Sequence, residues 1–315
     1  KSVLTIHNLP FMGAGIDEVL DEYLIDPVTD PSLPVWAQKI PLPMGIACAD
    51  SCIAVSPTYA SEIQTKEYGC GLEEYLSNNR HKLTGIINGI DINLWDPQTD
   101  RALCANFSAE KIGERSKNKH TLQSELNLPV DQSTPLLCFI GRMDHQKGVE
   151  IIPPALRMLK DKPWQCVFLG TGDSELEEAI RLFAAAFPEQ VRAHIAFDPV
   201  MARKLYASAD MIMIPSKYEP CGLVQMIAMR YGCVPIARAT GGLRDTINDQ
   251  ASSRTGYLFQ SNDSAHLAEV VHTALTEYHN DRLWKEIQYR GMLQNFSWSR
   301  SAKQYWATYR ELLGG

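Results

Sequence analysis

The sequence has 315 residues, of which 45% are hydrophobic and 21% are charged, and its formal net charge is −7. This composition is typical of a globular protein with a substantial core, and the length predicts about two domains. The acidic balance argues against a nucleic-acid-binding or membrane-surface protein, and no apolar run approaches the roughly 18 residues of a membrane span.

The chain begins with Lys rather than Met, and its first residues show no signal-peptide pattern. We therefore expect a fragment, a processed form or a trimmed form of a protein that is not secreted. The eight cysteines are scattered, and several lie in apolar, strand-like runs, which indicates buried free thiols in a reducing compartment. Without a Cys-x-x-Cys motif or a histidine cluster, the sequence predicts no metal site and no cofactor.

The first part of the chain is the less regular one. It contains strand candidates at 2–7, 52–56 and 84–88 and a proline-rich stretch at 27–43. A polar run at 113–124 is typical of a surface helix or a linker, and we place the domain boundary between 118 and 134. Residues 1–117 supply fewer strands than a complete doubly wound domain, so we expect the beginning of that domain to be missing.

From 133 to 293, short apolar runs alternate with longer amphipathic ones. The strand candidates are 135–141, 165–170, 191–197, 210–215, 233–237 and 256–259. The helix candidates are 148–160, 173–187, 199–208, 222–231 and 263–279. This alternation predicts a parallel, doubly wound α/β sheet, whose ligands bind outside the carboxyl ends of the strands. Residues from 298 onward indicate an amphipathic C-terminal helix.

Two chemistry-bearing segments follow the first two strands of this sheet. In Gly-Arg-Met-Asp-His-Gln-Lys-Gly at 141–148, Arg142 and Lys147 are five apart, and two such cations can grip a diphosphate. The alternative is a solvated charged loop. In the second segment, at 169–173, Gly170 and Thr171 permit a tight turn with close backbone approach to a ligand, although glycines also simply end strands.

A third segment, 215–225, follows the strand at 210–215. Pro220 is expected in the first turn of the next helix, so that free N–H groups near Cys221, Gly222 and Leu223 favour an anion. Glu219 stands beside them, where a carboxylate can accept hydrogen bonds from sugar hydroxyls. Its alternative role is that of a charge on the helix dipole.

A fourth segment, 239–246, follows the strand at 233–237. Thr240 is expected to cap a helix that starts near Leu243, and Gly241 and Gly242 offer an anion-sized backbone concavity. Four such segments at the same end of successive strands describe a site for a sugar linked to a diphosphate.

At these residues the sequence resembles the starch synthase and bacterial glycogen synthase family, glycosyltransferase family 5. The resemblance extends over nearly the whole chain and is most specific in Glu-Pro-Cys-Gly-Leu at 219–223 and Thr-Gly-Gly-Leu at 240–243. Further matching stretches are Thr-Ile-His-Asn-Leu (5–9), Ser-Pro-Thr-Tyr-Ala-Ser-Glu-Ile (56–63), Gly-Ile-Ile-Asn-Gly-Ile-Asp (85–91), Trp-Asp-Pro (95–97), the segments 141–148 and 170–173, and Ala-Met-Arg-Tyr-Gly (228–232).

The resemblance implies a GT-B fold, in which two Rossmann-like domains face a cleft. It implies transfer of glucose from ADP-glucose to the non-reducing end of an α-1,4-glucan, with retention of configuration and without a required metal. The domains would be 1–125, the C-terminal part of the acceptor-side domain plus a linker; 126–295, the nucleotide-sugar domain; and 296–315, a helix that packs back on the first domain. The compartment would be the bacterial cytoplasm or the plastid stroma.

Carried over to this chain, the resemblance makes Arg142 and Lys147 the diphosphate ligands that stabilise the departing ADP. Glu219 would orient the donor through its sugar hydroxyls. The glucose and phosphate pocket would be lined by Cys221, Gly222, Leu223, Gly241 and Gly242.

Three further residues take roles by the same resemblance. Phe197 would stack on the adenine, His7 would face the transferred glucose, and Asn88 would help shape the cleft. His7 also fits a structural histidine that follows a strand. With no Asp or Glu placed as a covalent nucleophile, the family implies front-face substitution through an oxocarbenium-like state.

Two departures from the wider pattern matter. The family's Lys-Thr-Gly-Gly-Leu-type segment is absent, and Ile227 stands where the wider fold class has a second Glu; the starch synthase branch shares that second feature. Two alternatives stay open. One is a different GT-B enzyme, such as a UDP-sugar glycosyltransferase, and the other is a catalytically silent fragment that binds a nucleotide sugar or a glucan.

Overall fold

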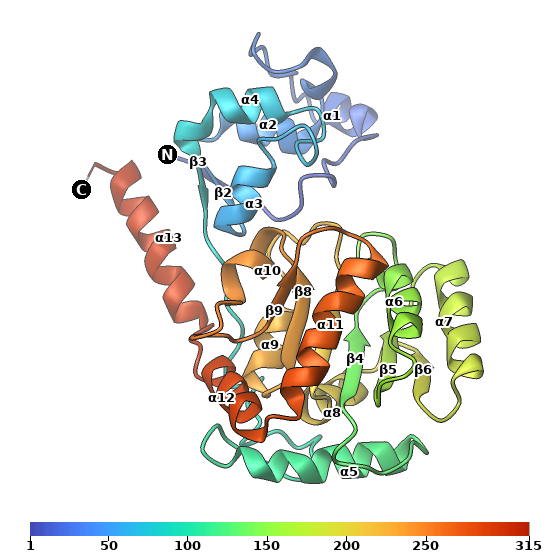
Figure 1. Cartoon of the computed structure of the whole chain (residues 1–315). Coiled ribbons are helices and arrows are strands. Elements are labelled where there is room, and N and C mark those ends of the chain that lie inside the picture. Colours follow the sequence, from blue (N-terminus) through green and yellow to red (C-terminus); the bar gives the residue numbers. More distant parts are fainter. Residues whose placement is uncertain (315) are drawn as a thin grey trace. The chain divides into compact units, whose positions relative to one another are not determined.

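The computed structural model describes residues 1–314, apart from the side chain of Asp17. The chain forms two compact units (Figure 1). Unit 1 comprises Lys1–Gly89, Glu219–Cys221 and Trp298–Gly315, and unit 2 comprises Ile90–Tyr218 and Gly222–Ser297.

Unit 1 is built on a three-stranded parallel sheet in the order β1-β2-β3, in which Val3 pairs with Ser51 and Cys52 with Leu83. Its strands are β1 (Val3–Ile6), β2 (Ser51–Ala54) and β3 (Leu83–Gly85), and its helices are α1 (Asp17–Glu22), α2 (Pro41–Cys48), α3 (Pro57–Glu62), α4 (Glu73–Asn78) and α13 (Trp298–Leu312), with 3-10 turns at Val35–Ala37 and Arg80–Lys82. The predicted strands at 2–7, 52–56 and 84–88 are confirmed. Pro41 opens α2 at a position where its missing N–H costs nothing, so the proline-rich stretch ends in a helix start.

Unit 2 is built on a six-stranded sheet in the order β6-β5-β4-β7-β8-β9, with every neighbouring pair parallel. The strands are β4 (Leu136–Ile140), β5 (Gln165–Gly170), β6 (Val191–Ile195), β7 (Met211–Ile214), β8 (Val234–Arg238) and β9 (Tyr257–Phe259). This is the doubly wound order, in which the strand sequence reverses between the first and fourth strands of the sheet, here β4 and β7. The predicted α/β fold is confirmed strand by strand.

The helices of unit 2 connect these strands. They are α5 (Arg115–Glu125), α6 (Ile152–Met158), α7 (Ser174–Ala186), α8 (Pro199–Ser208), α9 (Val224–Arg230), α10 (Gly241–Thr246), α11 (Ser264–Tyr278) and α12 (Asp281–Met292), with 3-10 turns at Ile112–Glu114 and Val149–Ile151. The helix candidates from 148 to 279 are all confirmed, with ends that differ by a few residues. Helix α12 has no counterpart among the helices predicted from the sequence.

The core of unit 2 lies on both faces of this sheet, which is why its strands read as continuous apolar runs rather than alternating ones. Phe139, Phe168 and Met213 are almost fully buried there, and Phe168 meets Phe183 of α7 edge to face at 6.2 Å between ring centroids. The Cys166 thiol is enclosed in the same layer, and burial raises its pKa well above the ordinary value.

Several helices of unit 2 begin at an aspartate that ends a loop at the carboxyl edge of the sheet. Asp173, Asp198 and Asp263 each accept hydrogen bonds from two backbone N–H groups in the first turn of α7, α8 and α11. Such caps typically stabilise a helix by about 1 kcal/mol. The caps fix the residue at which each strand-to-helix loop ends. They therefore set the length of each loop at the carboxyl edge of the sheet.

The expected domain boundary at 118–134 differs from the division in the structure, which falls between Gly89 and Ile90. Residues 90–125 group with unit 2 because they are anchored to its helices. Asp100 accepts hydrogen bonds from Arg203 of α8 at 2.8 Å and from the Tyr231 hydroxyl at 2.6 Å. The start and end of unit 2 are also joined, since the Ile90 N–H donates to Phe296 O at 2.8 Å. Helix α13 groups with unit 1, where the Ser301 hydroxyl donates to Ile87 O at 2.6 Å.

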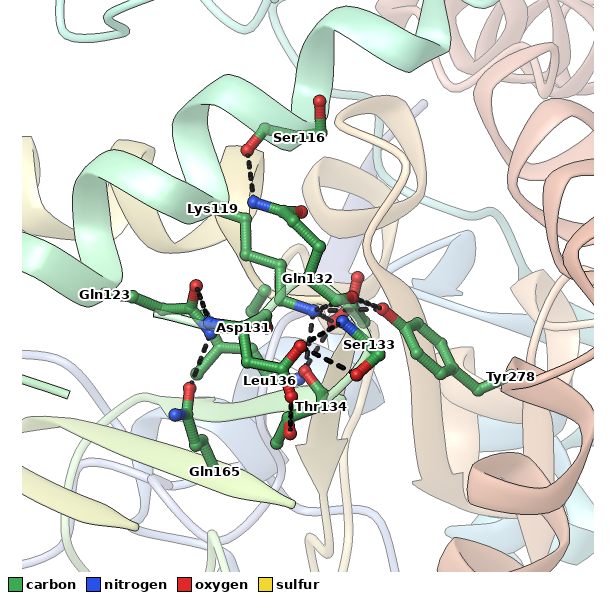
Figure 2. Close-up of polar contacts among 12 residues, drawn as sticks. Ser116, Lys119, Gln123, Asp131, Gln132, Ser133, Thr134, Leu136, Gln165 and Tyr278 are labelled. Carbon is green, nitrogen blue, oxygen red and sulfur yellow. Dashed lines mark hydrogen bonds and ion pairs between the residues drawn. The ribbon is translucent and has the colours of Figure 1, made fainter. Parts of the chain in front are cut away.

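The polar run at 113–124 is a surface helix, as the sequence suggested, but one face of α5 is buried although its sequence is polar. It lies at the end of the sheet where β4 begins (Figure 1), and the charged heads of Arg115 and Lys119 are buried. Lys119 donates to Asp210 Oδ2 at 2.7 Å and to Thr134 O at 2.7 Å, and Figure 2 shows its side chain reaching the loop before β4. Lys119 therefore connects α5 to the loop before β4 and to Asp210 before β7.

Candidate functional site

The reversal of strand order between β4 and β7 marks the place where a doubly wound sheet normally binds its ligand. Two of the four predicted segments follow these strands directly, 141–148 after β4 and 215–225 after β7. The segments after β5 and β8 flank them, because β5 neighbours β4 and β8 neighbours β7. The parts of these segments that belong to unit 2 therefore lie at one edge of its sheet, as the sequence predicted.

The loop after β4 carries both predicted cations, and a carboxylate connects them. Arg142 Nη1 lies 2.9 Å from Asp144 Oδ2, while Asp144 Oδ1 accepts a hydrogen bond from the Lys147 backbone N–H at 2.9 Å. The Arg142 side chain is 62% exposed. This loop thus presents an accessible guanidinium, with its geometry fixed by a turn that Asp144 closes.

The loops after β4 and β7 are joined by backbone contacts. The Lys217 N–H donates to Gln146 O at 2.8 Å, and Gln146 Nε2 donates to Tyr218 O at 3.4 Å. Gly148 has φ +69°, and a Cβ there would lie 2.1 Å from Pro215 O, so only glycine fits this crossing. The junction keeps the cations next to the β7 loop.

The loop after β5 is joined to the same structure. The Met143 N–H donates to Thr171 O at 3.0 Å, and the Asp173 N–H donates to Met143 O at 2.7 Å. A Cβ on Gly170 would meet Gly141 O at 1.8 Å. Gly170 is therefore required so that the loops after β4 and β5 can contact each other. From the sequence alone, this role could not be distinguished from close approach to a ligand.

Thr171 is held by a residue of α7, the helix that follows its loop. Its hydroxyl donates to Glu177 Oε1 at 2.5 Å, and the Gly172 N–H donates to the same oxygen at 2.9 Å. These two hydrogen bonds, the Thr171 one foremost, lower the pKa of Glu177. A ligand that contacts this loop meets a threonine whose hydroxyl proton is already committed.

The segment after β7 is divided between the two units. Glu219 and Cys221 are buried and group with unit 1, where the Ser56 hydroxyl donates to Pro220 O at 2.6 Å. Helix α9 starts at Val224, so the prediction that Pro220 lies in its first turn is wrong. Gly222, with φ +72°, and the N-cap at Leu223 separate Pro220 from the helix in the chain.

The residues after Cys221 return to unit 2. Gly222 has φ +72°, a left-handed conformation that favours glycine, and Leu223 is the N-cap of α9 with an exposed side chain. Gln225 Nε2 donates to Gly222 O at 2.9 Å and to the Thr246 hydroxyl at 3.1 Å, which connects the start of α9 with α10.

The segment after β8 gives a helix two residues earlier than predicted. Thr240 occupies the N-cap position of α10, but its side chain makes no capping hydrogen bond, and the helix begins at Gly241 rather than near Leu243. Thr240, Gly241 and Gly242 are all buried.

Phe197 follows β6, the edge strand of the sheet on the β5 side. Its side chain is 87% exposed, which is unusual for a phenylalanine held between a strand and a capped helix. An exposed ring on a rigid turn is a suitable platform for stacking on a planar ligand.

The two remaining predicted residues lie in unit 1. His7 follows β1 directly and is exposed, and Asn88 comes three residues after β3 and is half-buried. Because β1 and β3 are both parallel to β2, the two residues lie toward the carboxyl ends of strands at one edge of this sheet. The predicted site residues thus form two groups, one in each unit, with Glu219 and Cys221 in the group of unit 1.

The sequence analysis did not identify Glu150, a functional candidate near the cations. Glu150 Oε1 pairs with Lys217 Nζ at 3.0 Å and with His145 Nδ1 at 3.2 Å. Burial raises the pKa of Glu150, but hydrogen bonds from its own backbone N–H, from Lys217 and from His145 outweigh this and lower it. Asp144 and Gln146 were also missed, although the three-residue spacing from Asp144 to Lys147 is that of a capped turn.

Across residues 1–314, the structure groups no three His, Cys, Asp or Glu side chains in a way that could hold a metal ion. Nor does any described helix have the length and apolarity to cross a membrane. The cationic side chains at the site edge include those of Arg142, Lys147 and Lys217, of which Arg142 pairs with Asp144 and Lys217 with Glu150.

Comparison with known families defines the class of the protein. A family model for "Glycosyl transferases group 1" matches residues 124–290, and a model for "Starch synthase catalytic domain" matches residues 1–78. Together with the parallel sheets and the loops at the switch point, these matches identify a glycosyltransferase of the GT-B fold.

The individual relatives narrow this class. Glycogen synthase from Lactiplantibacillus plantarum is 42% identical over 321 residues, covering 99% of this chain and 67% of that protein. Glycogen synthase from Thermotoga maritima is 41% identical over 325 residues, with 99% and 65% covered. The catalytic domain of starch synthase IV from Arabidopsis thaliana, bound to ADP and acarbose, matches with a TM-score of 0.89 at 32% identity, covering 99% of this chain and 67% of that one. The chain belongs to the glycogen synthase and starch synthase family.

The chain spans about two thirds of the length of these relatives. More distant structures share the fold alone, such as sucrose-phosphate synthase from Thermosynechococcus elongatus, with a TM-score of 0.62 at 23% identity.

Proposed function

We propose that this chain carries the donor-binding part of a retaining glucosyltransferase that moves glucose from ADP-glucose to the non-reducing end of an α-1,4-glucan. The observation that supports this most directly is the pair of cationic residues, Arg142 and Lys147, on the loop after β4 at the switch point of the sheet. The family adds the donor and acceptor, since its relatives are named glycogen synthases and the starch synthase IV structure was bound to ADP and acarbose.

In this proposal Arg142 and Lys147 bind the diphosphate and neutralise the charge that develops on ADP as it departs. Phe197 supplies a stacking surface for the adenine. Backbone groups of Gly222, Gly241 and their neighbours are proposed to face the phosphate and glucose, since they lie at the starts of α9 and α10.

Glu219 is proposed to orient the glucosyl group through its hydroxyls, with Cys221 shaping the same pocket. His7 and Asn88 of unit 1 contribute to binding the transferred glucose and the acceptor. Gly170, Thr171, Leu223 and Thr240 complete the donor contacts. The reaction is proposed to need no metal or other cofactor, since two cationic side chains can supply the charge that a divalent ion would otherwise provide.

The first experiment uses the 315-residue chain with ADP-glucose and a short maltooligosaccharide, and measures chain extension and ADP release. Reactions with UDP-glucose, with EDTA and with the Arg142→Ala variant run beside it. We expect extension with ADP-glucose that resists EDTA and is lost in the variant.

The alternatives predict other outcomes. If glucose were transferred faster from UDP-glucose, UDP-glucose rather than ADP-glucose would be the donor. If the chain bound ADP but transferred no glucose, it would be a donor-binding part that needs further residues for catalysis. This outcome would fit a chain that spans two thirds of the length of its relatives. The absence of ADP binding would overturn the donor site. Fractionation of the source cells would test the expected location in the bacterial cytoplasm or plastid stroma.

A further inference from the structure

The guanidinium proposed to grip the diphosphate already has partners on both of its terminal nitrogens. Arg142 Nη1 lies 2.9 Å from Asp144 Oδ2, and Arg142 Nη2 donates to Gln146 Oε1 at 3.2 Å. The two partners differ in charge, because Asp144 supplies a carboxylate and Gln146 a neutral amide. Only Asp144, as an anion, competes with a phosphate for the Arg142 guanidinium.

The same carboxylate also shapes the loop. Asp144 Oδ1 accepts the Lys147 N–H at 2.9 Å, and the Asp144 carbonyl accepts the N–H groups of Lys147 at 3.1 Å and Gly148 at 3.2 Å. One aspartate therefore sets the turn that carries Lys147 and, with its other oxygen, holds Arg142.

The neighbouring charges do not take over this role. His145 and Lys217 instead pair with Glu150, at 3.2 and 3.0 Å. Within the described part of the chain, Asp144 is the carboxylate whose ion pair with Arg142 the structure records.

We propose that Asp144 is a positioning residue and the resident counter-ion of the diphosphate grip. It keeps Arg142 beside the turn of Lys147 when no nucleotide is bound, and it competes with the phosphates for the guanidinium. This inference rests on the proposed function, because it assigns a role to a residue of the proposed donor site.

The competition has a predictable size and direction. An exposed Arg–carboxylate pair is weak, so a diphosphate with more charge displaces the aspartate readily. Displacing it nevertheless costs part of the binding free energy, which lowers the affinity for ADP about threefold to fivefold relative to a site without the carboxylate. Weaker retention of ADP favours its release after each transfer.

The decisive variant is Asp144→Asn, because asparagine retains an oxygen for the Lys147 N–H but removes the charge that faces Arg142. We expect it to bind ADP about threefold to fivefold more tightly than the parent chain by isothermal titration calorimetry, and more so at low salt. Asp144→Ala loses the turn as well, so it should bind ADP more weakly than Asp144→Asn. In steady-state transfer, Asp144→Asn should lower KM for the donor without raising kcat.

A matched control comes from the cap of α11. Asp263 likewise accepts backbone N–H groups with one oxygen, and its other oxygen lies 2.7 Å from His266 Nδ1. Asp263→Asn therefore makes the same chemical change outside the four loop segments assigned to the donor and should leave ADP affinity unchanged.

The Arg142→Ala background separates this proposal from the donor site itself. If Asp144 acts through Arg142, the tightening by Asp144→Asn should disappear in Arg142→Ala. An unchanged or weakened affinity in Asp144→Asn, or the same tightening in both backgrounds, would overturn the competition. If Arg142→Ala itself leaves ADP binding unchanged, the proposed donor site fails instead, whatever Asp144 does.

Discussion

Two pairs of cations lie at opposite ends of the unit 2 sheet, and they are used in opposite ways. Arg142 and Lys147 lie on the loop after the carboxyl end of β4, whereas Arg115 and Lys119 of α5 lie where β4 begins. The Arg142 side chain is 62% exposed and meets one carboxylate of its own loop. The Lys119 side chain is 3% exposed and is surrounded by acceptors from three other segments.

The difference lies in what remains for a ligand. Lys119 donates to Gln132 O, Thr134 O, Asp210 Oδ2 and the Tyr278 hydroxyl, so every ammonium proton is used. Arg115 likewise reaches the carbonyls of Tyr206, Ala209 and Tyr231. A buried cation that saturates itself with protein acceptors stabilises the fold, and a cation left exposed beside a weak partner is available for binding.

The largest expected effect comes from breaking the buried pair. Lys119→Met should lower the free energy of unfolding by about 3 kcal/mol, because it takes the central donor from the Asp210 carboxylate and the two loop carbonyls of Figure 2. Asp210 keeps the Leu136 N–H at 2.8 Å and Arg115 at 3.8 Å, so the loss stays at the low end for a broken buried pair. Urea unfolding followed by tryptophan fluorescence measures this.

Lys117→Met is the matched control, since Lys117 lies on the same helix with a 64% exposed side chain and pairs with the neighbouring Glu114. Its effect should stay within about 0.5 kcal/mol. Equal losses in both variants would contradict the structural role assigned to Lys119.

Breaking the exposed pair should show the reverse pattern. Arg142→Ala is expected to lower glucosyl transfer about 10²–10³-fold, as for the loss of one group that stabilises developing charge, and to change the free energy of unfolding by no more than about 0.5 kcal/mol. Initial rates of ADP release together with urea unfolding measure both quantities.

Arg282→Ala, which removes a 90% exposed arginine of α12, serves as the control and should change neither quantity. A stability loss for Arg142→Ala as large as that of Lys119→Met would abolish the distinction between the two ends of the sheet.

An intermediate effect is expected where the loop with the exposed cations crosses the β7 loop. Gly148→Ala places a Cβ 2.1 Å from Pro215 O and forces alanine to φ +69°, which should cost about 1–3 kcal/mol and weaken ADP binding. Gly113→Ala is the control, because its Cβ would have no neighbour within 4 Å. Thermal unfolding and calorimetry would compare the two, and a fully stable Gly148→Ala would argue against a close crossing.

The sequence alone predicted one end of the sheet better than the other. The strands of unit 2 and the loop from Gly141 to Gly148 could be predicted because their signals are local: apolar runs, turn glycines and two cations within one segment. The roles of Arg115 and Lys119 could not, since their acceptor Asp210 lies about ninety residues away in the chain. The hydrogen bonds from Arg203 and Tyr231 to Asp100 also join residues more than a hundred positions apart, so they could not be predicted either. Without them, the boundary between the two units was predicted in the wrong place.

The smallest effect concerns the loop that delivers Gln132 and Thr134 to Lys119. Hydrogen bonds from the side chains of Thr134 and Ser133 and from the Ser133 N–H lower the pKa of Asp131 to about 2, against 3.8 for an ordinary aspartate. A group whose pKa is lower in the folded state binds protons more readily when unfolded, so its stabilisation is present above about pH 4 and is lost as the pH falls toward 2. Asp131→Asn should therefore reduce the urea midpoint slightly at pH 6, and the difference from the parent chain should shrink on acidification below pH 4. The site is largely exposed, so the change is expected to be much smaller than that of Lys119→Met. A difference that grew as the pH fell would show that the carboxylate does not order this loop, and that Lys119 is placed by the core alone.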